Sequence, residues 1–201
     1  LMALSMMGLF GTIITLPLLL QRAFAMTPLQ VGLMMLPGGL LMGVLGPIVG
    51  RLYDRVGPRV LLVPALTVVA GVFAALSTLT TASPWWFVLV CHLTMSAAFA
   101  FIFTSLFTTA LGALPRHLYS YGSASIGTIQ QLAGAAGTAL FVTVFSMQAQ
   151  VARTAGASEA ASLLAGSHWG FLGAGAVMTA AAITALFLSK PADAPEGIAA
   201  H

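Results

Sequence analysis

The chain has 201 residues, of which 59% are hydrophobic and 5% are charged, and its formal net charge is +3. A soluble domain averages about 25% charged residues, so this composition excludes an ordinary water-soluble protein and predicts one that lipid surrounds. The basic residues stand singly at the ends of apolar runs, which excludes a nucleic-acid-binding surface. The single cysteine, Cys91, excludes an intrachain disulfide and a cysteine-based metal cluster.

Six apolar runs follow one another along the chain, and each is long enough for a spanning helix of about 20 residues. The predicted spans are residues 1–20, 30–49, 60–80, 85–111, 124–147 and 168–188. They predict an all-α integral membrane bundle over residues 1–188 and a disordered tail over residues 189–201. No basic stretch or cleavage site precedes the first run, so we expect no signal peptide. Residue 1 is Leu and already lies inside that run, so we expect a fragment whose N-terminal portion is missing.

The basic residues divide unequally between the two sides of this bundle. Five fall on one side and two on the other: Arg51, Arg55, Arg59, Arg116 and Lys190, against Arg22 and Arg153. The positive-inside rule makes the first side cytoplasmic. The sequence therefore predicts a multi-pass plasma-membrane protein whose C-terminus is cytoplasmic.

Residues 50–59 are expected to form a short charged turn between the second and third spans. The carboxylate of Asp54 could cap the N-terminus of a neighbouring helix, where the first N–H groups lack partners. The nearby arginines could hold anionic lipid headgroups or a partner carboxylate. The alternative is a solvated loop whose arginines only set the topology.

The fourth span carries a face of mixed polarity. His92, Ser96, Phe99 and Phe103 recur at helical spacing on that face. Such a face suits a cavity for amphipathic solutes, and a histidine can titrate near neutral pH. The alternative is a neutral His92 that is hydrogen-bonded to a neighbouring helix.

Four further polar residues in the spans are weaker candidates for the cavity wall. Gln130 and Gln131 need hydrogen-bond partners in hydrocarbon, which either the cavity or a neighbouring helix could supply. Thr12 and Thr15 could line the cavity or bond to their own backbone. Pairs of glycines also predict close helix packing, at Gly39 and Gly43, Gly46 and Gly50, and Gly134 and Gly137.

The acidic residues all fall outside the predicted spans. They are Asp54, Glu159, Asp193 and Glu196. The chain contains no H-E-x-x-H motif, no intramembrane aspartate pair and no G-x-S-x-G motif, which argues against a membrane enzyme. We therefore predict no catalytic residue, no metal and no cofactor.

Three segments carry a family resemblance. Residues 50–59 fit G-x-L-x-D-R-x-G-x-R, which resembles the signature loop of the major facilitator superfamily. Residues 21–37, with Thr27-Pro28-Leu29, and residues 131–139, with Gln131-Leu132-Ala133-Gly134, resemble segments of its fourteen-span drug:proton antiporter branch. The order of the three segments is that of the C-terminal six-helix half. Gln130 departs from the pattern, because that branch usually has an arginine there.

The resemblance implies a fold, a function and a set of site residues. The loop would be a gate between two six-helix halves, formed by Gly50, Asp54, Arg55, Gly57 and Arg59. The first and fourth spans would line the cavity, the second and fifth would flank it, and the third and sixth would be peripheral. The missing N-terminal half would complete the transporter and supply the acid that titrates.

The implied function is secondary active transport in a bacterial inner membrane, with proton-coupled efflux of drug-like amphipathic small molecules. Its partners would be the solute, protons, the lipid bilayer and the N-terminal half. Two alternatives stay open. One is an uptake or metabolite carrier of the same superfamily. The other is a non-transporting membrane scaffold or a channel, although a channel should show a polar stripe through a whole span.

Overall fold

Six long helices make up nearly all of the part of the chain that the computed structural model describes, residues 1–188. The predicted tail at 189–201, with Lys190, lies outside the described residues. The helices are α1 (Met2–Arg22), α2 (Pro28–Val56), α3 (Pro58–Ser77), α4 (Trp85–Gly112), α5 (Tyr119–Thr154) and α6 (Glu159–Ala185), with a 3-10 turn, η1 (Arg116–Leu118), before α5.

Five of these elements in residues 1–188 are long and apolar enough to cross a membrane: α1, α2, α3, α4 and the segment Arg116–Thr154. The predicted sixth span, α6, has 27 residues and is long enough, but it is not one of the five. It is rich in alanine and glycine, which are less apolar than leucine or valine, and it carries the polar His168. It packs along α3 and α5 as a member of the same bundle.

The charged segment at residues 50–59 was predicted as a turn, and most of that prediction is wrong. Helix α2 continues through Val56, so Gly50, Asp54 and Arg55 lie in its last two turns. Only Gly57 interrupts the helices, with φ of 77°, a conformation that glycine adopts without steric cost. Helix α3 then starts at Pro58, whose ring favours the first helical position.

The predicted connection at residues 148–167 is also mostly helical. Helix α5 continues to Thr154 and α6 begins at Glu159. The hydroxyl of Ser158 caps α6 by accepting from the Ala161 amide at 3.3 Å. The predicted spans ended where polar residues begin. A helix can continue past that point, because its backbone hydrogen bonds are satisfied within the helix whatever the side chains are.

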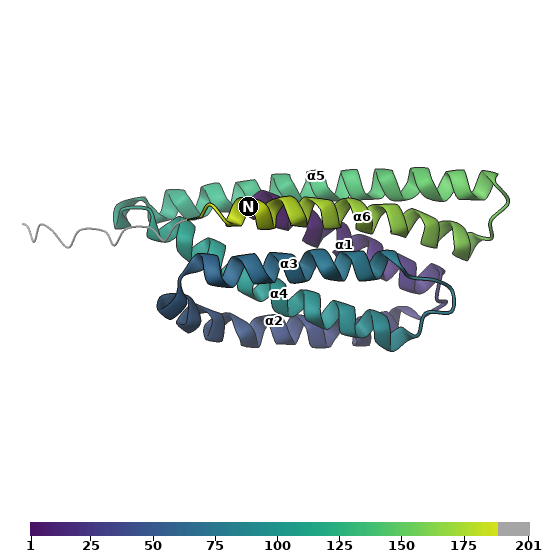
Figure 1. The fold of residues 1–201 in the computed structure, drawn as a ribbon, viewed down its shortest axis with the longest axis horizontal. Coiled ribbons are helices and arrows are strands. Elements are labelled where there is room, and N and C mark those ends of the chain that lie inside the picture. The colour runs from purple at the N-terminus through teal and green to yellow at the C-terminus, as the bar shows by residue number, and fades with distance from the viewer. Residues whose placement is uncertain (189–201) are drawn as a thin grey trace, which may run out of the picture.

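The helices run along one axis and alternate in direction, so the connections collect at two ends (Figure 1). The end where α2 passes to α3 and α4 to α5, here called the arginine-rich end, carries Arg51, Arg55, Arg59 and Arg116. The opposite end carries Arg22 and Arg153. The sequence-based division of these arginines is therefore confirmed, while the cytoplasmic placement of the arginine-rich end stays a prediction.

Packing divides the bundle into two groups of three helices (Figure 1). Helix α1 packs against α5 and α6, helix α4 packs against α2 and α3, and α3 and α6 join the groups. Helices α1, α2 and α3 correspond in order to α4, α5 and α6. The contact of α1 with α5 then corresponds to that of α4 with α2, and the contact of α1 with α6 corresponds to that of α4 with α3. This is the pattern of two three-helix repeats, as found in halves of transporters.

One pair of contacts breaks the repeat symmetry. Helices α5 and α6 pack extensively, whereas the corresponding helices α2 and α3 barely touch. Near the turn at Gly57, α2 and α3 meet in a small cluster of Val49, Tyr53 and Leu61. Helix α2 therefore has a long face that no other described residue covers, including exposed Leu33 and Leu40.

Glycines and aromatic rings set the contacts between α1, α3, α5 and α6. A Cβ on Gly137 of α5 would overlap the backbone of Met7 in α1. Phe171 of α6 stacks on Phe73 of α3 with ring centroids 6.2 Å apart, and meets Phe141 of α5 edge-on at 5.5 Å. Such dispersion contacts hold helices together where lipid removes the hydrophobic driving force.

The glycine predictions divide between two helices. The close packing expected at Gly134 and Gly137 is confirmed. The glycine pairs of α2 make no such contact, because a Cβ on any of them would meet no described atom within 4 Å: Gly39, Gly43, Gly46 and Gly50. This face of α2 is available to something other than residues 1–188.

Candidate functional site

The charged groups of the arginine-rich end point away from the bundle. Arg51, Asp54, Arg55 and Arg59 are all exposed. Within residues 1–188, the only ion pair joins Arg22 to Glu159 at the opposite end, with 3.7 Å between Nη1 and Oε1. The acid and the arginines therefore do not neutralise one another within the described chain.

Asp54 does not cap the adjacent helix. Helix α3 starts after Gly57 without a side-chain cap hydrogen bond, and Pro58 lacks an N–H group. A cap from Asp54 to a neighbouring helix would thus need a partner beyond the described residues. The role of Gly50, Asp54, Arg55, Gly57 and Arg59 as a gate stays a prediction.

Sequence reasoning missed the residue that anchors this corner. Tyr53 lies beside Asp54 but points inward, and its hydroxyl oxygen is 2.9 Å from that of Thr109 in α4. Thr109 donates its own proton to the Ser105 carbonyl oxygen at 2.7 Å, so Tyr53 is the donor between the hydroxyls. The sequence did offer an indication, because Tyr53 is the aromatic residue of the charged segment. A tyrosine can bury its ring against a neighbouring helix while its hydroxyl forms a hydrogen bond.

His92 joins α4 to α2. Its Nε2 atom lies 3.2 Å from the Met35 carbonyl oxygen, so Nε2 carries the proton and donates it. Nδ1 is buried without a hydrogen-bond partner among residues 1–188. Gly38 makes this approach feasible, because a Cβ there would overlap both His92 and Ser96.

The predicted face of α4 is buried within the bundle. His92 and Ser96 are each 8% exposed, and Phe99 and Phe103 are 1% and 7% exposed. The two phenylalanine rings stack with centroids 5.4 Å apart. The geometry is that of the alternative interpretation, a histidine bonded to a neighbouring helix, and the role of these four residues in a cavity wall stays a prediction.

Three of the remaining candidates make contacts inside the bundle. Thr12 donates to the Gly8 carbonyl oxygen at 2.8 Å in its own helix, and Thr15 is buried beside it in α1. Gln130 of α5 donates from Nε2 to the Met2 sulfur at 3.5 Å. The geometries of Thr12 and Gln130 match the structural alternative for each of them, and the role of Thr15 stays a prediction.

Gln131, in contrast, lines an open groove of about 590 Å³ between α1 and α5, here called the α1–α5 groove. Its wall combines an amide, two hydroxyls and apolar groups, without a charge: Phe10, Gln131, Gly134, Ala135, Thr138, Ala139, Val142 and Thr143. Sequence reasoning missed Phe10, Thr138 and Thr143. The signal was present, because Gln131 and Thr138 are seven residues apart and share a helix face.

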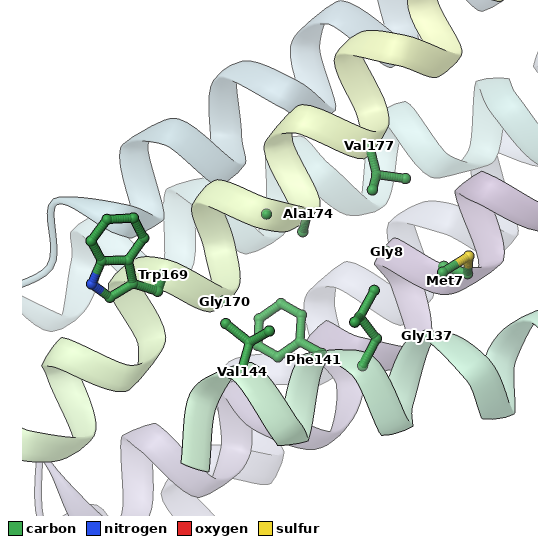
Figure 2. A pocket seen from close by; sticks show the side chains of 11 residues that line it. Met7, Gly8, Gly137, Phe141, Val144, Trp169, Gly170, Ala174 and Val177 are labelled. Carbon is green, nitrogen blue, oxygen red and sulfur yellow. The ribbon is translucent and has the colours of Figure 1, made fainter. Parts of the chain in front are cut away.

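A second opening, the α2–α3 groove, has a volume of about 520 Å³ and lies where α2 and α3 separate. It is lined by Leu41, Val60, Leu61, Pro64, Ala65, Val68, Leu93, Thr94, Ala97, Ala98 and Phe101. The repeat-related position between α5 and α6 is nearly filled and keeps a pocket of about 120 Å³. Figure 2 shows Phe141 within that pocket and Trp169 at its edge.

Apolar helices arranged as three-helix repeats are typical of membrane transporters. Residues 1–138 match the family model described as Major Facilitator Superfamily. The chain therefore belongs to the major facilitator superfamily. It is an all-α, multi-pass membrane protein of a family whose members move small molecules.

Relatives from three bacteria support this assignment. The chain is 35% identical over 91% of its length to the uncharacterized MFS-type transporter YcnB of Bacillus subtilis. It is 35% identical over 71% of its length to the lincomycin resistance protein LmrB of Listeria monocytogenes. It is 31% identical over 65% of its length to the multidrug export protein EmrB of Haemophilus influenzae. The chain spans 38%, 30% and 26% of these relatives, respectively.

Proposed function

We propose that residues 1–188 are the C-terminal six-helix half of a fourteen-span drug:proton antiporter in a bacterial plasma membrane. The complete transporter exports drug-like amphipathic molecules, and its C-terminus is cytoplasmic. The relatives named for lincomycin resistance and multidrug export support this solute class. The short coverage of those relatives supports a further set of helices beside this one.

The α1–α5 groove is the observation that carries the proposal. Its amide and hydroxyl groups can orient a solute, while Phe10 and Val142 offer apolar contact. The absence of a charge from the groove wall favours solutes of varied structure over one fixed ionic ligand. The exposed face of α2 and this groove would both turn toward the other half.

The exchange of protons for solute requires a group that titrates. Among the described residues the two acids are Asp54 and Glu159, which lie near helix ends. The coupling carboxylate is therefore proposed to lie in the other half. The transporter would alternate between a state open to the cytoplasm and a state open to the outside. Proton binding would favour one of these states, and the groove would contribute affinity for the solute.

Inverted membrane vesicles that contain the complete transporter test the proposal. An imposed proton gradient should drive accumulation of ethidium or lincomycin, and collapse of the gradient should abolish it. Gln131→Ala and Thr138→Ala should change the preference between the two solutes several-fold. Gln150→Ala, on an exposed turn of α5 outside the groove, is the matched control.

Two outcomes would contradict the proposal. Accumulation that persists without a proton gradient would exclude proton coupling. Gradient-driven movement of a polar metabolite, with no movement of either drug, would establish the uptake or metabolite carrier instead.

A further inference from the structure

The α2–α3 groove is apolar and opens to the side of the bundle. Val60 and Val68 of α3 form one wall, Leu41 of α2 forms the other, and Ala97 and Phe101 of α4 form the floor. The corresponding position between α5 and α6 is nearly closed. The groove is therefore a feature of the first three-helix repeat and not a general gap between helices.

The α3 wall of the groove spans about the depth of one lipid leaflet. Val60 is the third residue of α3 and lies next to the arginine-rich end. Eight residues separate it from Val68, which is about 12 Å at a rise of about 1.5 Å per residue. One leaflet of a hydrocarbon core about 30 Å thick measures about 15 Å. An acyl chain that enters at the arginine-rich end would thus reach Val68 near the bilayer midplane, and Leu41 of α2, sixteen residues before Gly57, lies deeper.

Positive charge stands at the mouth of the groove. Arg59 directly precedes Val60 on the α3 wall. Arg55 lies two residues before the turn at Gly57, on the same face of α2 as Leu41 but about 21 Å further along the helix. Both arginines are exposed, and neither forms an ion pair within residues 1–188. Asp54 is the acid at this corner, while Glu159 lies at the opposite end and pairs with Arg22.

We propose that the α2–α3 groove binds an anionic phospholipid. One acyl chain lies along Val60, Val68 and Ala97, and the phosphate lies between Arg55 and Arg59. The apolar groove alone would accept the chain of any lipid. The two arginines select an anionic headgroup, because each basic residue near a membrane surface favours anionic lipid by about fivefold. The proposal does not depend on which solute the transporter carries.

Native mass spectrometry of the complete transporter measures this preference. The probes are phosphatidylglycerol and phosphatidylcholine with the same acyl chains. Phosphatidylglycerol should remain bound more strongly, by about tenfold or more. Arg55→Gln with Arg59→Gln should lower its binding to that of phosphatidylcholine. Arg116→Gln, at the same end but on the α4–α5 connection, should leave the preference unchanged.

A second pair of variants tests the acyl-chain part of the site. Ala97→Phe fills the groove floor and should reduce binding of both lipids, while Gly173→Phe, in the pocket between α5 and α6, should not. Size-exclusion profiles and thermal midpoints verify that each variant is folded. Glycerol 3-phosphate, which has the headgroup charge without chains, should not displace the lipid.

Three results would overturn the proposal. Equal retention of the two lipids by the unmodified transporter would reduce the groove to an ordinary lipid contact. Displacement by glycerol 3-phosphate would make the arginines a site for free phosphate. Displacement by a transported drug, with no effect of the headgroup, would make the groove a lateral entrance for solute.

Discussion

The hydroxyl of Tyr53 in α2 donates to the hydroxyl of Thr109 in α4, with 2.9 Å between the oxygens. The residue after Tyr53 is Asp54, so the acid of the charged corner is fixed to α4 through its neighbour. If α4 moves relative to α2 at this end, the hydrogen bond breaks. If the bond stays intact, the two helices move together. The bond thus joins the proposed gate to a helix of the proposed cavity.

Tyr53→Phe should weaken this corner without preventing folding. A hydrogen bond between helices in a membrane contributes about 0.6 kcal/mol on average, and up to about 1.7 kcal/mol. A double-mutant cycle with Thr109→Val should return a coupling energy in that range, measured by thermal or denaturant unfolding of the complete transporter. Tyr121→Phe, which alters an exposed tyrosine, is the control. A coupling energy of zero would show that the bond contributes nothing to stability.

Gly137→Ala should destabilise the bundle, because the added Cβ would overlap the backbone of Met7. Overpacking of this kind costs about 1–3 kcal/mol, and a backbone neighbour cannot rotate away. The thermal midpoint and the yield of folded protein measure the effect. Gly173→Ala is the matched control, because a Cβ there meets no described atom within 4 Å. Equal midpoints for the two variants would contradict the close contact of α1 with α5.

Asp54→Asn should abolish or strongly impair transport by the complete protein while membrane insertion stays normal. Asp54 is exposed and has no ion-pair partner in residues 1–188, so the substitution breaks no ion pair within that part of the chain. Efflux assays and the amount of protein in the membrane separate the two effects. Arg116→Gln, another charge change at this end, should retain transport. Normal efflux by Asp54→Asn would reduce Asp54 to a residue that sets topology.

His92→Ala should change which solutes are carried more than it changes coupling to protons. The variant loses the bond to the Met35 carbonyl oxygen, so α2 should shift relative to α4. Transport of several solutes, with and without an imposed pH gradient, distinguishes the effects. His117→Ala, on the 3-10 turn η1, is the control histidine. A uniform loss of gradient-driven flux, with solute binding preserved, would identify His92 as the coupling group.

The arginine-rich end should face the cytoplasm. Cys91 is buried and is the only cysteine, so a new cysteine can be labelled selectively. A membrane-impermeant maleimide added to intact cells should label Ala157→Cys, in the α5–α6 connection, and should not label Arg55→Cys. Permeabilised cells, in which both sites should react, are the control. The reverse pattern would invert the topology.

The sequence predicted the helices better than their ends. The apolar runs located all six helices. The four arginines Arg51, Arg55, Arg59 and Arg116 were correctly assigned to one end of the bundle. Residues 50–59 were predicted to form a turn because charged side chains gather there, yet charged side chains can stand on the last turns of a helix, as they do in α2. The helix itself ends at Gly57, where the backbone conformation changes.

The candidate site could be predicted only in part, because helical periodicity does not state which face meets which neighbour. His92 and Gln131 are both polar residues within apolar helices. The first is buried against Met35 and the second lines an open groove. That difference comes from the pairing of α4 with α2 and of α1 with α5, which depends on contacts such as Gly38 and Gly137.

The pairing of α1 with α5 and α6 also constrains the order of assembly during synthesis. Met7 meets Gly137, and these residues are 130 positions apart in the chain. At about 5–20 residues per second, α1 must wait roughly 6–26 seconds after its own synthesis before that contact can form. Helices α2, α3 and α4 are all synthesised in that interval and can form one packed group, while the main partners of α1 do not yet exist.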